Sequence, residues 1–308
     1  PRRVRFITQC LMNMYDRTTE EDYFVARVMI ESARWLQQNR DAERIFLTVE
    51  SFDPHEPWFV PAHYRQLYDR SEGREQVISL YGSTTEMAPD LLHRTQMNYS
   101  GLVTMCDRWF GYLYDAMAAL GMLENTLVIV TSDHGHSLGD RDYMGKRGYP
   151  FTPEVVDIPL LIRHPSGVGA GRKSDLLVQH TDITALVLEA AGVNPPQPLH
   201  GQPFWQAALA GGPALRDHAT VGWGSGLAVI NERWWLNGKV NGRGIFLHDL
   251  TASGDPFAVN VADDHPQIVR RLFRAGLADA GGSFPAFLLD LAERDADAPG
   301  CSALVARE

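Results

Sequence analysis

The chain has 308 residues, 44% of them hydrophobic, which is enough for one large domain with a filled core and a second, smaller one. The formal net charge is -10 and the basic residues form no cluster, so the backbone of a nucleic acid is excluded as a natural partner. No apolar run is long enough to span a bilayer. The three cysteines, Cys10, Cys106 and Cys301, have neither the spacing of metal ligands nor that of a disulfide framework.

The first third of the chain predicts two helices with a strand between them. Apolar residues recur at helical spacing over residues 21–38 and again, as one clear stripe, over residues 102–120. The short apolar run 44–49 predicts a buried strand. It leads into a loop, residues 51–58, in which two prolines exclude regular structure.

Strands then alternate with helical patterns. The run 126–131 is β-branched and apolar throughout, as expected of a strand covered on both faces. Further strands are predicted at 158–163 and 176–178, and a helix from about 182 to 191. This alternation indicates an α/β layered domain with a largely parallel sheet.

The pattern changes after about residue 211, where short strands replace the long alternation. They are predicted at 219–223, 227–231, 233–236 and 245–250, with tight turns at Asn237-Gly238 and Asn241-Gly242 and a helix over 266–277. We therefore expect a main domain over residues 1–211, a small antiparallel sheet with one helix over 212–281, and a loosely patterned tail over 282–308.

Two polar loops follow predicted strands. One follows Val49 and carries His55, and the other follows Thr131 and carries Asp133 and His134. Ligands of open α/β sheets collect outside the carboxyl ends of the strands. The sequence therefore predicts that both loops aim titratable side chains at one rim.

Asp133 and His134 form a candidate metal-ligand pair. A carboxylate is a hard anionic ligand, and a neutral imidazole is the commonest nitrogen ligand. Neighbouring side chains on a strand point to opposite faces, so both reach one ion only if the chain turns, which Gly135 permits. An isolated Asp-His-Gly is more often a capped strand end with a solvated histidine, so the residues downstream decide between the two interpretations.

Downstream, Leu138-Gly139 and Gly145-Lys146 follow at a characteristic spacing. The whole stretch from Asp133 to Gly148 resembles the second metal-ligand motif of the type I sulfatases, which are arylsulfatase-like members of the alkaline phosphatase superfamily. Other segments resemble the family in the same order, over nearly the whole chain. They are 52–58 (its Pro-His-x-Pro loop), 158–162, 179–183, 199–201 and 246–250, the last with Asp255-Pro256 and Asn260.

The resemblance implies a fold, an activity and a set of roles. The fold would be an alkaline-phosphatase-like α/β/α sandwich with a mostly parallel sheet, plus a small C-terminal antiparallel-sheet subdomain. The activity would be metal-dependent hydrolysis of small sulfate esters, with Ca²⁺ as the expected cation. Asp133 and His134 would be metal ligands, while His55 and Lys146 would contact the ester group. A cation and an ammonium suit the negative charge that develops in ester cleavage, and a histidine can donate a proton to the leaving oxygen.

Each of these residues also has a plainer interpretation. His55 would be a loop histidine bonded to backbone, and Lys146 an ordinary surface lysine. Four further residues would either shape the pocket or simply be solvated: His136, Asp140, Arg141 and Arg147. His180 and His200 are expected to join loops. Four tryptophans could line a pocket, although core packing is the expected role: Trp58, Trp223, Trp234 and Trp235.

The nucleophile of the family is absent from the sequence. Sulfatases carry a Cys-x-Pro-x-Arg motif whose cysteine becomes formylglycine (serine may replace it), and an Asp-Asp metal pair near the N-terminus. None of the three cysteines lies in such a motif. We therefore expect a fragment whose partner is the N-terminal part of the same enzyme. Alone, the fragment should be inactive, bind metal weakly and be poorly soluble. The compartment stays open, since any targeting segment would lie upstream.

Two other interpretations stay open. A phosphonate monoester or phosphodiester hydrolase of the same superfamily would use Mn²⁺ or Zn²⁺, and a histidine at position 134 fits such softer cations. A non-catalytic remnant would keep the fold and only bind. Release of sulfate or phosphate from paired nitrophenyl esters separates the two hydrolases.

Overall fold

A computed structural model describes residues 2–73, 78, 81–210 and 215–294, and it forms two compact units. Unit 1 comprises Pro1–Ile129, His136–Lys146 and Ile162–Ser166. Unit 2 comprises Val130–Gly135, Arg147–Leu161 and Gly167–Glu308. Each unit is described by itself below.

Unit 1 is mainly helical. Its helices are α1 (Arg2–Met14), α2 (Phe24–Gln38), α3 (Ala62–Arg65) and α4 (Pro89–Ala119), with single 3-10 turns at Glu20–Asp22, Met122–Asn125 and Asp140–Asp142. Its strands β1 (Gly82–Ser83), β3 (Ser137–Leu138) and β4 (Tyr143–Gly145) form a three-stranded sheet in the order β1-β4-β3. Both pairings in this small sheet are antiparallel.

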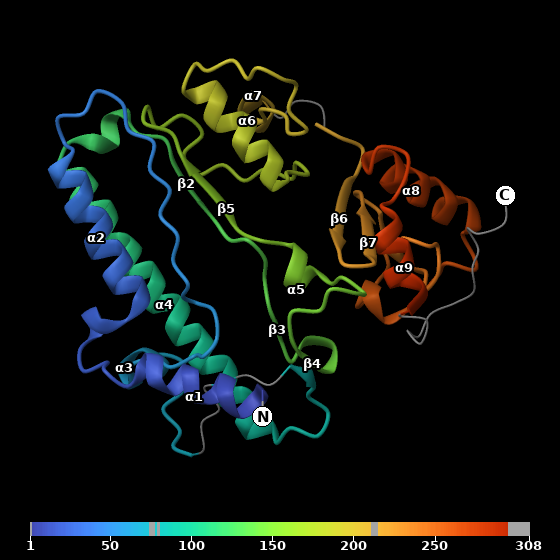
Figure 1. Cartoon of the computed structure of the whole chain (residues 1–308), viewed down its shortest axis with the longest axis horizontal. Helices are drawn as coiled ribbons and strands as arrows, with labels where there is room; N and C mark the ends of the chain where they lie inside the picture. The colour runs from blue at the N-terminus through green and yellow to red at the C-terminus, as the bar shows by residue number, and fades with distance from the viewer. Residues whose placement is uncertain (1, 74–77, 79–80, 211–214, 295–308) are drawn as a thin grey trace. The chain divides into compact units, whose positions relative to one another are not determined.

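The core of unit 1 lies between α2 and α4, which run side by side (Figure 1). Leu102 and Met105 of α4 are fully buried with Val25 of α2, as the apolar stripes of both segments predict. The two predicted helices are therefore confirmed, although α4 begins at Pro89, earlier than expected. Gly121 follows α4 with a left-handed φ of 69°, the conformation in which glycine commonly ends a helix.

The strand predicted at residues 44–49 is wrong. This segment has no strand assignment, and Phe46 is 78% exposed, while Ile45 and Val49 pack against the α2–α4 core. A strand is held by hydrogen bonds to a neighbour, and no described residue pairs with this segment. The expected burial is wrong as well, because only Ile45 and Val49 of this run are half-buried and the others are exposed.

The boundary between the two units falls within two strands, β2 and β5. β2 (Val128–Thr131) and β5 (Leu160–Arg163) form a two-stranded sheet, which confirms the strands predicted at 126–131 and 158–163. Residues 128–130 of β2 are only half-buried, and Thr131 is exposed, so the expectation of two covered faces is wrong. The short strand predicted at 176–178 is also absent, because that segment pairs with no described strand.

Unit 2 contains the C-terminal sheet and most of the remaining helices. The helices are α5 (Pro153–Val156), α6 (His180–Ala190), α7 (Trp205–Ala210), α8 (Pro266–Asp279) and α9 (Ala286–Arg294), with a 3-10 turn at Pro256–Ala258. The strands are β6 (Ala219–Trp223), β7 (Gly226–Ile230), β8 (Trp234–Lys239) and β9 (Phe246–Asp249). They form a four-stranded antiparallel sheet in sequential order, which confirms the predicted small sheet.

One of the two predicted tight turns is wrong. Asn241-Gly242 does turn the chain between β8 and β9, and Gly242 has a φ of 76°. Asn237-Gly238, however, lies inside β8, where Asn237 is fully buried. The Asn237 side chain accepts a hydrogen bond from the Phe151 N–H at 2.8 Å and donates one to the Phe151 carbonyl at 3.0 Å. A buried amide satisfied by distant backbone gives no local signal that separates it from a turn residue.

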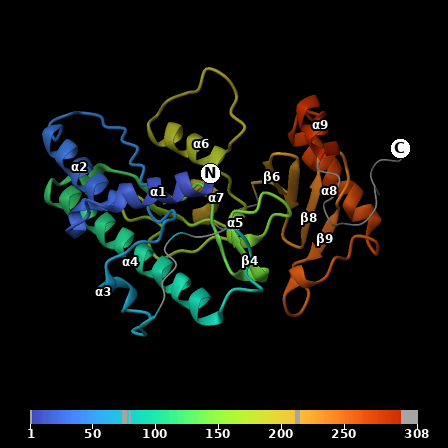
Figure 2. The same cartoon turned by 60° about the horizontal axis from the view of Figure 1, so that its bottom comes forward.

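Helices α8 and α9 lie beside the four-stranded sheet (Figure 2). Val269 and Leu272 of α8 share a core with Leu227 and Val229 of β7. Helix α9 lies within the segment 282–308, where only a loosely patterned tail was expected, and residues 295–308 lie outside the described part. The domain boundaries expected at 211 and 281 stay predictions. None of the described helices is both long and apolar enough to cross a bilayer.

Candidate active site

The loop from Ser51 to Trp58 is anchored at several points in unit 1. Asp53, which is 8% exposed, accepts a hydrogen bond from the Val25 N–H at 2.8 Å, at the start of α2. The indole of Trp58 is buried and donates to the Pro54 carbonyl at 3.1 Å. Burial raises the pKa of Asp53, so this carboxylate depends on its backbone donor. These contacts fix the segment that carries His55.

His55 is held on both sides of its ring. Its Nδ1 atom lies 2.7 Å from the Glu56 carbonyl oxygen, and its ring stacks on Phe52 with centroids 4.3 Å apart. A carbonyl only accepts hydrogen bonds, so Nδ1 carries the proton and Nε2 has the free lone pair. The backbone-bonded interpretation of His55 is therefore confirmed, and the same bond leaves Nε2 available for chemistry.

Lys146 follows β4 directly. Gly145 precedes it with a φ of 121°, and a Cβ there would lie 2.8 Å from the Tyr81 ring. Only glycine fits both the backbone conformation and this contact. β4 pairs with β1 and β3, so the small sheet sets the point at which Lys146 leaves it.

Lys146 and His55 meet in unit 1. The Lys146 Nζ atom lies 2.5 Å from the His55 Nε2 atom. The Lys146 side chain is 11% exposed and that of His55 is 31% exposed. The interpretation of Lys146 as an ordinary surface lysine is therefore wrong. An ammonium beside an imidazole nitrogen makes a couple that can present positive charge and a proton to an anion.

A buried carboxylate completes this cluster. Glu56, with a side chain 5% exposed, lies between His55 and Lys146, at 3.3 Å from Nδ1 and 3.7 Å from Nζ. Its other oxygen accepts a hydrogen bond from the Tyr81 hydroxyl at 2.5 Å. Burial alone would raise the pKa of Glu56, but the Tyr81 hydrogen bond and the charges of His55 and Lys146 outweigh it, so the pKa is lowered. Glu56 is therefore ionised when Tyr81 and Lys146 are in place.

Sequence reasoning missed Glu56. Its only sequence signal is an acidic residue beside the candidate histidine, between two prolines. His136 also belongs to the cluster. Its Nδ1 atom lies 3.8 Å from a Glu56 oxygen, its side chain is 8% exposed, and its ring meets the edges of Trp58 and Tyr81. The interpretation of His136 as a solvated residue is wrong.

Asp133 and His134 lie in unit 2, just beyond β2. The Asp133 side chain is 84% exposed, and its Oδ2 atom lies 3.4 Å from the His134 Nε2 atom. The Nδ1 atom of His134 lies 2.9 Å from the Gly135 carbonyl oxygen, which places the proton on Nδ1. That tautomer turns the Nε2 lone pair toward the carboxylate, an arrangement that suits two ligands of one divalent cation.

Gly135 has a different role from the one predicted. Its φ is outside the positive range, so no left-handed turn occurs there. Instead its N–H donates to the Val155 carbonyl at 2.9 Å, and a Cβ at this position would lie 2.1 Å from the Glu154 carbonyl oxygen. Close approach of α5, rather than turn geometry, requires glycine.

His180 and Trp223 lie beside this pair within unit 2. The His180 Nε2 atom lies 2.8 Å from the Ser132 carbonyl oxygen, which confirms that His180 joins two loops. The Trp223 ring lies 6.4 Å from the His134 ring, and Trp223 is 49% exposed. The other three candidate tryptophans are buried, as core packing predicts: Trp58, Trp234 and Trp235.

The remaining candidates have lesser roles or none. Asp140 accepts from the Leu138 N–H and is exposed, as are Arg141 and His200. Arg147 is partly exposed. Among residues 2–73, 78, 81–210 and 215–294, no group of three or more acidic, histidine or cysteine side chains could hold a metal ion. A metal ion at Asp133 and His134 would therefore need further ligands from outside these residues.

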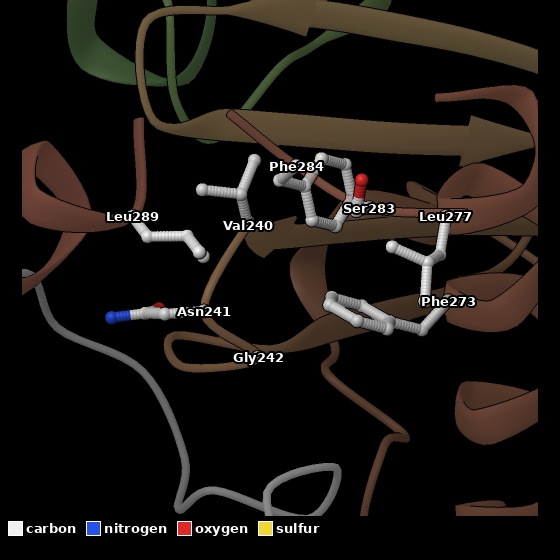
Figure 3. A pocket seen from close by; sticks show the side chains of 8 residues that line it. All are labelled: Val240, Asn241, Gly242, Phe273, Leu277, Ser283, Phe284 and Leu289. Carbon is white, nitrogen blue, oxygen red and sulfur yellow. The ribbon is translucent and has the colours of Figure 1, made fainter. Parts of the chain in front are cut away.

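Two hollows in unit 2 include none of His55, Lys146, Asp133 and His134, although Trp234 lines the second. One, of about 320 Å³, is lined by Val240, Asn241, Gly242, Phe273, Leu277, Ser283, Phe284 and Leu289 (Figure 3). No side chain of this set titrates, so the hollow has no groups for acid–base or metal chemistry. The other, of about 660 Å³, lies among residues 172–177, 207–208, 216–217, 231–234 and 271.

The cysteines do not supply a nucleophile in the described part. Cys10 is buried, and burial raises the pKa of Cys106 to about 12. A thiol with so high a pKa stays protonated and unreactive. Cys301 lies outside the described residues.

Residues 5–193 match the family model described as sulfatase. Among curated proteins, a multifunctional alkaline phosphatase superfamily protein, PehA of Trinickia caryophylli, is 25% identical over 213 residues, 60% of this chain and 41% of PehA. An endo-4-O-sulfatase of Bacteroides thetaiotaomicron is 31% identical over 179 residues, 54% of this chain and 33% of that protein. The chain thus spans less than half the length of these relatives.

The fold is that of solved members of the superfamily. A phosphonate monoester hydrolase of Agrobacterium radiobacter superposes with a TM-score of 0.69 at 22% identity, covering 85% of this chain and 61% of that one. At this identity the likeness concerns the fold alone. It confirms the predicted alkaline-phosphatase-like α/β class with a C-terminal antiparallel sheet.

Proposed function

The chain belongs to the sulfatase family, and from that premise we propose that it forms part of an enzyme that hydrolyses small sulfate esters, with His55 and Lys146 contacting the ester group and Asp133 and His134 holding a metal ion. The observation that carries the proposal is the buried Lys146–His55 couple, 2.5 Å between nitrogen atoms. The Lys146 side chain is 11% exposed and lies beside an imidazole lone pair, and an ammonium in this position suits an oxyanion.

In the His55–Lys146 couple, proton transfer takes place at Nε2 of His55, as the hydrogen bonds of its ring indicate. Because the His55 Nδ1 proton is held by the Glu56 carbonyl, Nε2 is the atom that gains or releases a proton. Nε2 shares its hydrogen bond with Lys146 Nζ, so the couple can carry one positive charge toward the ester oxygens. The shared proton passes from Lys146 Nζ to His55 Nε2 and on to the leaving oxygen, and the remaining N–H groups of Lys146 bind a sulfuryl oxygen.

Members of the superfamily generally use divalent metals, and the local chemistry of Asp133 and His134 fits one. A bound divalent cation supplies Lewis-acid stabilisation of negative charge on the ester oxygens. Asp133 offers a largely exposed carboxylate, and His134 offers the lone pair of Nε2. The carboxylate of Asp133 favours Ca²⁺, our proposed metal, because Ca²⁺ prefers oxygen ligands.

The two sets of residues are neighbours along the chain, because only Gly135 separates His134 from His136 of the Glu56 cluster. The Cys-x-Pro-x-Arg motif of the family does not occur in the 308 residues, so no residue here is assigned as nucleophile. The relatives are more than twice as long as the aligned region, which leaves room for that group and further metal ligands elsewhere.

A phosphonate monoester or phosphodiester hydrolase is the second candidate function. The imidazole of His134 favours it, because nitrogen ligands suit Mn²⁺ or Zn²⁺ better than Ca²⁺. The solved phosphonate monoester hydrolase of the same fold is consistent with it. Both candidates need the same anion-binding couple, so the nature of the released ion separates them.

Paired 4-nitrophenyl esters test the proposal. The purified gene product is assayed with the sulfate and with the phenylphosphonate ester, each with Ca²⁺ and with Mn²⁺. We expect faster release of sulfate and a loss of about a hundredfold or more in Lys146→Ala. Lys173→Ala, at an exposed position, serves as the control. Absence of sulfate release by the unaltered protein, or equal rates in Lys146→Ala, would overturn the proposal.

A further inference from the structure

Glu56 lies in a cluster with His55, His136 and Lys146, and its negative charge repels a bound anion. Its carboxylate is 5% exposed and lies within 4 Å of three nitrogen atoms, Nδ1 of His55, Nδ1 of His136 and Nζ of Lys146. A buried anion costs free energy unless donors and cations compensate it. An anion-binding site built for the greatest positive charge would omit such a group.

The contacts of Glu56 hold it ionised. The Tyr81 hydroxyl donates to Oε1, while Oε2 faces the three nitrogen atoms. Burial raises the pKa of Tyr81, and the neighbouring carboxylate raises it further, so the phenol keeps its proton and remains a donor. Tyr81 in turn packs on Gly145, directly before Lys146. The carboxylate and the lysine are thus positioned by one aromatic side chain.

We propose that Glu56 sets the charge of the anion site: it holds Lys146 as an ammonium beside His55, and its negative charge makes the site select singly charged esters over doubly charged ones. The proposal deepens the proposed function and rests on it for the anion. Glu56 is a positioning residue, since it acts through Lys146 and need not touch the ester.

The selectivity follows from a count of charges. With neutral histidines, Lys146 and Glu56 contribute one positive and one negative charge, so the described cluster is neutral overall. Sulfate esters and phosphonate monoesters carry one negative charge, whereas phosphate monoesters carry two near neutral pH. Each additional negative charge on the ligand meets additional repulsion from Glu56 at short range and low dielectric. Replacement of Glu56 by glutamine removes that repulsion without removing a side chain.

The protonation of Lys146 can be read without any ester. The sequence has three lysines, Lys146, Lys173 and Lys239, so competitive acetylation with trace acetic anhydride resolves each by mass spectrometry. Only the neutral amine reacts. We expect Glu56→Gln to raise the acetylation rate of Lys146 relative to exposed Lys173 by at least about threefold. An unchanged ratio would overturn the proposal, whatever reaction the protein catalyses.

Charge selection is measured with two probes of the same shape. Benzenesulfonate is a monoanion, and phenylphosphonate is a dianion in mildly alkaline buffer. We expect the unaltered protein to bind benzenesulfonate more tightly, and Glu56→Gln to shift the ratio of the two dissociation constants about tenfold toward phenylphosphonate. If neither probe binds, the proposed function fails, while the acetylation ratio still decides the role of Glu56.

Two further variants separate charge from structure. Tyr81→Phe keeps the carboxylate but removes one of its donors, so we expect the same ratios to move less than in Glu56→Gln, in the same direction. Asp53→Asn replaces another buried carboxylate of the same loop, one whose partner is the Val25 N–H, so it measures loosening of the loop and should move both ratios less than Glu56→Gln does. Equal effects of Asp53→Asn and Glu56→Gln would show a general loosening of the loop and would refute the proposal.

Discussion

The Nζ atom of Lys146 lies 2.5 Å from the Nε2 atom of His55, although 91 residues separate them in the chain. Two local features produce this meeting. The loop that carries His55 is tied to the start of α2 through Asp53, and Lys146 leaves β4 where Gly145 packs under Tyr81. The chain brings a base and an ammonium together in a mostly buried setting. There the electrostatic attraction of each group for an anion is stronger than in water.

Loss of either proposed metal ligand should weaken metal binding. His134→Ala removes the Nε2 lone pair, and Asp133→Asn removes the negative charge beside it. We expect each change to lower the affinity for Ca²⁺ or Mn²⁺ by at least about tenfold, measured by isothermal titration calorimetry. His200→Ala, at an exposed histidine, is the matched control and should bind normally. Unaltered affinity in both ligand variants would remove Asp133 and His134 from the metal site.

Gly135→Ala should damage the same site through the backbone. The added Cβ would lie 2.1 Å from the Glu154 carbonyl oxygen, so α5 or the Asp133–His134 segment must move. We expect a loss of about 2 kcal/mol or more in the free energy of unfolding, with weaker metal binding. Gly111→Ala is the control, because its Cβ meets nothing within 4 Å inside α4, and alanine there should stabilise by up to about 1 kcal/mol.

The ion pair between Asp182 and Arg216 should dominate the stability of its part of unit 2. Asp182 is fully buried, and Arg216 donates to both of its oxygens at 2.6 Å. Arg216→Ala leaves a buried carboxylate with no cation, which should cost about 3–5 kcal/mol in chemical unfolding. Arg233→Ala breaks the exposed pair with Asp249, and should cost no more than about 1 kcal/mol. Similar losses in the two variants would contradict this assignment.

The same pair predicts a loss of stability in acid. Burial alone would raise the pKa of Asp182, but the hydrogen bonds from Arg216 and from two backbone N–H groups outweigh it, so the pKa lies below its ordinary value of 3.8. A carboxyl with a lowered folded-state pKa contributes its full stability above the ordinary value and loses it as the pH falls through the folded value. Urea unfolding between about pH 6 and about pH 3 should show this decline, and Asp182→Asn should flatten it. Parallel curves for the two proteins would exclude Asp182 as the source.

Local sequence patterns predicted the helices and the C-terminal sheet well. The stripes of α2 and α4 and the short strands β6 to β9 each depend on residues close in sequence, and each was confirmed. The runs 44–49 and 176–178 were wrong because an apolar or β-branched run becomes a strand only when a partner lies beside it. Periodicity within a segment contains no information about that partner.

The candidate site shows the same limit. His55 and Lys146 were proposed from a resemblance, and the structure brings them together, but Glu56 and the buried position of His136 could not be seen in advance. Burial turns Glu56 from a common loop residue into a charge that three nitrogen atoms share, and burial is a property of the assembled unit. Gly135 was placed correctly for the wrong reason, since the carbonyl of Glu154 that requires it comes from another element.

The most direct test of the central claim is a crystal structure of the protein soaked with Mn²⁺ and sulfate. The account predicts an ion bound to a carboxylate oxygen of Asp133 and to Nε2 of His134 at about 2.0–2.3 Å, and a sulfate that accepts hydrogen bonds from Lys146 and His55. A metal bound to neither Asp133 nor His134, or a sulfate that contacts neither Lys146 nor His55, would contradict it.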